Sequence, residues 1–149
     1  MKRRLLILMV LLTFLTIAFI LFNALSDGAH AEGKRDAVVR IFVGSRSLRR
    51  QVLKVVAKTF HVMEYAFFSF CFTSSVILLG DCKARFERVL LCGTFLALGD
   101  ELIQSLFSDR TSRLTDVFVD LAGIMIGYWV SVCLARLIQK RKLRRKKGT

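Results

Sequence analysis

The chain has 149 residues, which is room for one domain, and 54% of them are hydrophobic. Together with a mean hydropathy of +0.53, this content excludes a disordered chain and an ordinary soluble domain. The net charge of +13 is typical of nucleic-acid binding in soluble proteins. Here the charges separate long apolar runs, so we expect a lipid bilayer as the partner and no nucleic acid. The four cysteines lack the pattern of a secreted disulfide framework and are interpreted as packing thiols.

Four apolar stretches are long enough to cross a bilayer, which takes about 20 residues of α-helix. They cover about residues 5–25, 59–79, 89–107 and 117–138. The predicted fold class is all-α, an integral membrane bundle of four transmembrane helices. We expect one membrane domain over residues 1–149, ending in a basic tail at 139–149.

The first span also admits a second interpretation. Three basic residues precede its apolar stretch and Ala29-His30-Ala31 follows it, a pattern that is also typical of a cleaved signal peptide. The apolar stretch is longer than the roughly 7–15 residues of a signal peptide, which favours a retained membrane helix. Either outcome leaves the following loop outside.

Basic residues predict the orientation of the four spans. Lysines and arginines number 14 in the amino terminus, in Gly80–Arg88 and from Arg136 onward, against 10 in Ser26–Lys58 and Ser108–Asp116. The positive-inside rule then places both termini in the cytoplasm. The dense run from Lys140 to Lys147 contributes most, and we interpret it as a topology anchor near anionic lipid.

Residues 47–58, just before the second span, have the pattern of an amphipathic helix. Apolar residues recur at helical spacing, and basic residues largely occupy the other face. The apolar positions are Leu48, Val52, Val55 and Val56, and the basic ones are Arg49, Arg50 and Lys54. We therefore expect a helix that lies on the outer membrane surface and leads into the second span.

Polar residues inside the spans are not scattered, because each span carries them on one helical face. The second span has Lys58, His61, Glu64 and Tyr65, the third Asp100, Glu101 and Gln104, and the fourth Asp116 and Asp120. With both termini cytoplasmic, all three stripes fall in the outer halves of their spans, and the connecting turn adds Arg110. The inner halves are almost purely apolar. The sequence therefore predicts one polar pocket just beneath the outer surface.

Small residues at helical spacing predict close contacts between the spans. They are Gly93, Ala97, Gly123 and Gly127. Such residues allow helix backbones to approach each other closely in membranes.

The polar stripes have a structural and a functional interpretation. A network of polar side chains fastens helices, but one interhelical hydrogen bond contributes only about 0.6 kcal/mol, which apolar packing can replace. Five carboxylates are a costly fastener, so we favour a functional pocket. Asp120 and Gln104 remain the best candidates for structural members.

Three segments resemble the VanZ-like membrane protein family. Residues 57–65 carry Lys58, His61, Glu64 and Tyr65 at the spacing of the first signature. Residues 100–110 resemble the second, from Asp100-Glu101 through Gln104 to Arg110, and 115–123 continue with Asp116, Asp120 and Gly123. The chain departs from the family at Ile103, where a histidine is frequent, and at Ser108-Asp109, where the family often has Pro-Gly.

The resemblance implies a small multi-pass protein of the bacterial cell membrane. The founding member of the family is associated with low-level resistance to the glycopeptide teicoplanin. A fold-level likeness does not by itself supply a biochemical function.

Two functions from different classes fit the predicted pocket. The first is binding or remodelling of an envelope lipid precursor or a glycopeptide, with Arg110 as the anion clamp. The other ligand-binding candidates are Lys58, Tyr65, Asp100, Gln104 and Asp120.

The second is an intramembrane acid/base hydrolase or transferase that acts on a lipid-linked substrate. Its candidate catalytic residues are His61, Glu64, Glu101 and Asp116. The spacing His-x-x-x-His, which is typical of zinc sites, is absent. Carboxylates alone would favour Mg²⁺ or Mn²⁺, but a metal site is the weaker interpretation. We therefore expect no metal and no other cofactor. Ion translocation is disfavoured because it needs polar groups across the whole bilayer.

Overall fold

The computed structural model describes residues 2–25, 39, 45–80, 86–107 and 114–147, and within these ranges all regular structure is α-helical. The helices are α1 (Lys2–Leu25), α3 (Arg46–Leu79), α4 (Phe86–Phe107) and α5 (Leu114–Lys147). All four are long and apolar enough to cross a membrane. The predicted all-α bundle of four spans is therefore confirmed.

Two of the helices are longer than a bilayer is thick. α3 and α5 have 34 residues each, which corresponds to about 50 Å of helix against a hydrocarbon core of about 30 Å. α3 contains both the amphipathic segment 47–58 and the second span without interruption. It ends at Gly80, whose positive φ of 107° suits glycine and whose N–H bonds to the carbonyl of Ile77.

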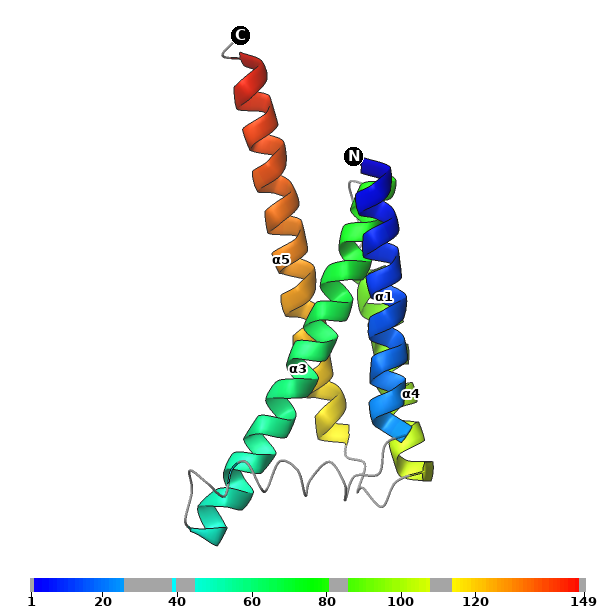
Figure 1. Cartoon of the computed structure of the whole chain (residues 1–149), viewed down its shortest axis with the longest axis vertical. Helices are drawn as coiled ribbons and strands as arrows, with labels where there is room; N and C mark the ends of the chain where they lie inside the picture. Colours follow the sequence, from blue (N-terminus) through cyan, green and yellow to red (C-terminus); the bar gives the residue numbers. More distant parts are fainter. Residues whose placement is uncertain (1, 26–38, 40–44, 81–85, 108–113, 148–149) are drawn as a thin grey trace.

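The helices form a bundle with two distinct ends (Figure 1). The start of α1 and the end of α5 lie at one end, as expected for an even number of spans. The opposite end, here called the far end, holds the end of α1, the early part of α3, the end of α4 and the start of α5. The most extensive contact joins α3 and α5, while α1 packs on α3 and α4, and α4 on α5.

Glycines allow α5 to lie directly against the backbone of α3. A Cβ atom placed on Gly123 would be 2.6 Å from the carbonyl oxygen of Val62. One placed on Gly127 would collide with the carbonyl of Ala66, one turn further along α3. Both separations are shorter than any normal packing distance, so these two positions require glycine.

The contact between α4 and α5 also depends on small residues. A Cβ atom on Gly93 would be 2.5 Å from the side chain of Ile124, and Ala97 is fully buried one turn away. The predicted close approach at the small residues is therefore confirmed on both sides of α5.

Toward the termini, α3 and α5 carry buried and half-buried hydroxyl groups, some of which join the two helices. We call this group the hydroxyl seam: Ser69, Thr73, Ser74, Ser75 and Ser131. Ser69 donates to the carbonyl of Ile124 at 2.7 Å, and Ser74 shares a 2.8 Å hydrogen bond with Ser131. This half was predicted to be almost purely apolar. It contains polar contacts as well, but the members of the hydroxyl seam are all uncharged.

Large apolar side chains cover the outside of the bundle. Exposed examples are Phe14 on α1, Met63 on α3, Leu102 on α4 and Trp129 on α5. A soluble monomer rarely exposes so much apolar surface, whereas lipid tails cover such a surface in a membrane.

Candidate functional site

Polar side chains from all four helices meet at the far end of the bundle. We call them the polar cluster: Asn23, Lys58, His61, Glu64, Tyr65, Asp100, Glu101, Gln104, Asp116 and Asp120. Within each helix they recur three or four residues apart, which places them on one face. The antiparallel arrangement of the helices brings these faces together at one level of the bundle.

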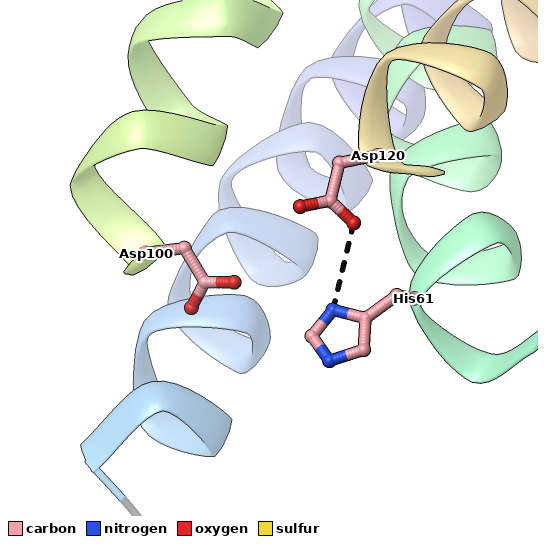
Figure 2. Close-up of side chains that lie close together, drawn as sticks. All are labelled: His61, Asp100 and Asp120. Atoms are coloured by element: carbon pink, nitrogen blue, oxygen red, sulfur yellow. Dashed lines mark ion pairs between the residues drawn. The ribbon is translucent and has the colours of Figure 1, made fainter. Parts of the chain in front are cut away.

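Three side chains form the centre of the cluster: His61 from α3, Asp100 from α4 and Asp120 from α5 (Figure 2). One nitrogen or oxygen atom from each lies within 4.8 Å of the other two. Nδ1 of His61 is 3.5 Å from Oδ1 of Asp120, an ion-pair distance. Asp100 is 1% exposed and Asp120 0%, whereas the His61 side chain is 26% exposed. His61 is therefore the part of the centre that surrounding molecules can reach.

The centre has buried polar atoms without hydrogen-bond partners. They include both carboxylate oxygens of Asp120, Oδ1 of Asp100 and Nδ1 of His61. The contact between His61 and Asp120 has the separation of an ion pair but not the geometry of a hydrogen bond. Since buried polar atoms are nearly always hydrogen-bonded in proteins, this is an unusual arrangement that needs an explanation.

The other oxygen of Asp100 is held in place. The hydroxyl of Tyr65 donates a hydrogen bond to Oδ2 of Asp100 at 3.3 Å, and Tyr65 is fully buried. Gln104 is buried one turn beyond Asp100 and is a second hydrogen-bonding neighbour of its side chain. These contacts orient the carboxylate and leave Oδ1 for the centre.

Two outer pairs join helices around this centre. Nζ of Lys58 lies 3.1 Å from Oδ1 of Asp116, which links α3 to α5. The amide of Asn23 donates to Oε1 of Glu64 at 2.9 Å, which links α1 to α3. The side chains of Lys58 and Asp116 are 51% and 31% exposed, so this pair borders the surface.

Negative charge exceeds positive charge in the buried part of the cluster. Asp100, Glu101 and Asp120 are all buried. Among the described members, only His61 and Lys58 can carry positive charge, and Lys58 already pairs with Asp116. A buried carboxylate is costly unless a cation or a hydrogen-bond donor compensates it. The cluster is therefore suited to bind a group that supplies either.

The comparison with family models decides the relationship of the chain. The model of one family, VanZ/LLP1, matches residues 5–136. The chain belongs to the VanZ/LLP1 family. The comparison with curated proteins found no match, and neither did the comparison with solved structures. The VanZ/LLP1 match includes every described member of the polar cluster.

The structure of this VanZ/LLP1 protein brings together nine of the ten residues chosen from the sequence as site candidates. The tenth, Arg110, lies outside the described residues. Asp120, for which the sequence favoured a structural role, lies at the centre beside His61. Their roles in binding or catalysis stay predictions.

Sequence reasoning missed Asn23, which brings α1 into the cluster. The available signal was a single amide side chain two residues from the end of a span whose other polar residues are Thr13 and Thr16. An amide inside a span indicates a partner on another helix. That partner is Glu64.

Proposed function

We propose that this VanZ-like protein binds the head group of an amphiphilic cell-envelope ligand in its polar cluster. The ligand class is an envelope lipid precursor or a glycopeptide with a lipid tail. The observation that carries the proposal is the buried polar centre, reached through the partly exposed His61. It lies at one end of helices whose outer surfaces are apolar, so the cluster suits a polar head and the surfaces suit its tails.

The chemistry of the cluster supports a head group rich in hydroxyl and amide groups. Buried carboxylates accept hydrogen bonds from such donors, and Gln104 both donates and accepts. Lys58, half exposed at the rim, and Arg110, between α4 and α5 in the sequence, supply cations for a phosphate or carboxylate on the ligand. Sugar and peptide head groups of envelope molecules combine these features. We extend the proposal to teicoplanin, the glycopeptide to which the founding member of the family is linked by resistance.

The orientation of the protein forms part of this proposal. With both termini cytoplasmic, as the basic residues favour, the far end and its cluster face the outside of a bacterial cell membrane. A reporter enzyme that is active only outside the membrane is fused after Thr149, and one that fluoresces only in the cytoplasm is fused there separately. Fluorescence without enzyme activity is the expected result. The reverse would place the cluster on the cytoplasmic side and overturn an outer-leaflet ligand.

A matched pair of substitutions on α4 tests the binding site. Glu101→Gln removes a buried charge of the cluster, whereas Glu87→Gln makes the same change at an exposed position near the opposite end of the helix. Both variants are expressed with wild type at equal membrane levels, and teicoplanin susceptibility and the envelope-lipid profile are measured. We expect Glu101→Gln to lose the phenotype and Glu87→Gln to keep it. Equal phenotypes for the two variants would contradict the proposal.

A second candidate function, acid/base hydrolysis or transfer on a lipid-linked substrate, is favoured by one contact. The imidazole of His61 lies 3.5 Å from the Asp120 carboxylate, close to the hydrogen bond by which a carboxylate would orient a general acid or base. For an enzyme, His61→Gln is expected to make a lipid substrate accumulate and its product disappear in the same mass spectra. For a binding protein, the variant loses protection while the lipid profile remains that of cells expressing wild type.

A further inference from the structure

We propose that His61, Asp100 and Asp120 hold a divalent transition-metal cation. These three side chains come from three different helices, so no short sequence motif predicts them as one set. They offer one imidazole nitrogen and two carboxylate oxygens, and these ligand types together favour cations such as Zn²⁺ or Mn²⁺. The histidine argues against Mg²⁺ and Ca²⁺, which prefer oxygen ligands.

The distances suit a cation after small side-chain rotations. Bonds of about 2.1 Å from a cation to nitrogen or oxygen place neighbouring ligand atoms roughly 3.0–3.4 Å apart. Nδ1 of His61 and Oδ1 of Asp120 are already 3.5 Å apart. All three ligand atoms lie within 4.8 Å of one another, so side-chain rotations that move them by roughly 1.4 Å complete the set.

The second observation is the set of buried atoms that lack hydrogen bonds. Asp120 is fully buried, and neither of its oxygens has a hydrogen-bond partner. Oδ1 of Asp100 and Nδ1 of His61 lack one too. Figure 2 shows one oxygen of Asp100 pointing toward His61 and Asp120. A metal ligand needs such a free lone pair, and two carboxylates neutralise a divalent cation inside an apolar bundle.

Tyr65 completes the arrangement as an orienting partner. Its hydroxyl binds Oδ2 of Asp100 and so fixes the carboxylate while Oδ1 stays available. Ligating carboxylates in metal sites typically have such a hydrogen-bonded partner, which holds them in the binding geometry.

A cation also resolves a difficulty in the proposed function. The buried carboxylates of the cluster repel a phosphate or carboxylate on a head group. A divalent cation with three protein ligands keeps coordination positions open for a ligand oxygen, so it would attract the same group. This role rests on the proposed function, but cation binding itself does not, because it is measured without any lipid.

The test uses the full-length protein, purified in detergent and washed with a chelator. Zn²⁺, Mn²⁺ and Co²⁺ are titrated separately by calorimetry, with bound metal counted by mass spectrometry and the Co²⁺ complex followed by visible absorption. We expect one cation per chain. His61→Ala should weaken binding by at least about tenfold and alter the Co²⁺ spectrum, because a nitrogen ligand is lost.

Controls separate this site from adventitious binding. Glu87→Gln removes an exposed carboxylate from α4 and should bind as wild type does. Asp100→Asn keeps the acceptor for Tyr65 and should weaken binding as His61→Ala does. Circular dichroism confirms that each variant is helical, and His61 is partly exposed, so its replacement is the least disruptive. The proposal is overturned when wild type shows no saturable binding or when His61→Ala binds equally well. In that case protons balance the carboxylates, and the head-group proposal is tested independently by Glu101→Gln.

Discussion

Along the contact between α3 and α5, the half nearer the termini contains hydroxyl groups, whereas the far end contains carboxylates and a histidine. In the hydroxyl seam, Ser69, Ser74 and Ser75 all have short hydrogen bonds of 2.7–2.9 Å. Only Thr73 among the seam's members lacks a partner. In the polar cluster, Asp120 has no hydrogen bond to either oxygen although it is just as buried.

This difference separates polar groups that stabilise the fold from polar groups that are kept for another purpose. Neutral hydroxyls are inexpensive to bury and satisfy their hydrogen bonds locally, so they suit a helix contact. A buried carboxylate without hydrogen bonds, such as that of Asp120, is expensive to bury and fastens poorly. We therefore expect substitutions in the seam, and of Gly123 and Gly127 in the same helix contact, to change stability alone. Substitutions at the centre of the polar cluster should change function.

The largest expected effect comes from the close contact of α5 with α3. Gly127→Ala places a methyl group onto the backbone of Ala66, which cannot move aside as a side chain does. We expect a loss of about 3 kcal/mol in the free energy of unfolding, the upper range for overpacking. Gly99→Ala is the matched control, because a methyl group there meets nothing within 4 Å. Denaturation in detergent, followed by circular dichroism, measures both; equal stability would show that this contact does not hold the helices.

An effect of opposite sign is expected at the centre of the polar cluster. Asp120→Asn keeps the shape of the side chain and removes a buried charge, so in chelator we expect stability to rise by about 1–2 kcal/mol. The protective phenotype should be lost. Asp116→Asn, one turn earlier on α5, removes only the rim pair with Lys58 and should change stability by less than about 1 kcal/mol. A marked loss of stability in Asp120→Asn would show that the polar cluster holds the helices together.

The sequence was sufficient to predict the spans and the level at which their polar faces meet. Hydropathy defines a span, and helical spacing puts His61 and Tyr65 on one face whatever their neighbours are. The sequence was insufficient to predict which polar side chains pair, because the pairs depend on how each helix is rotated about its axis. That rotation is set by contacts such as Gly127 on Ala66, which no spacing rule specifies. The pairing of Asp100 with Tyr65 and of Asp120 with His61 follows from it.

A moderate effect is expected where α1 joins the cluster. Asn23→Leu keeps the size of the side chain and removes the hydrogen bond to Glu64, which joins α1 to α3 at this level. We expect a loss of about 1 kcal/mol, within the range measured for interhelical hydrogen bonds in membranes. Thr16→Val is the control on the same helix, because the Thr16 hydroxyl donates its hydrogen bond to the carbonyl of Leu12 within α1. If both variants have the same free energy of unfolding, Asn23 does not hold α1 against α3.

The smallest effects are expected in the hydroxyl seam, and they should have opposite signs. Ser69→Ala removes the 2.7 Å hydrogen bond to the carbonyl of Ile124, so we expect a loss of about 0.6 kcal/mol. Thr73→Val keeps the shape of a buried side chain whose hydroxyl has no partner, so stability should rise by about 1 kcal/mol or less. Both are measured by the same denaturation. Neither should change the protective phenotype, because both residues lie outside the polar cluster; a lost phenotype in a stable variant would extend the functional site into the seam.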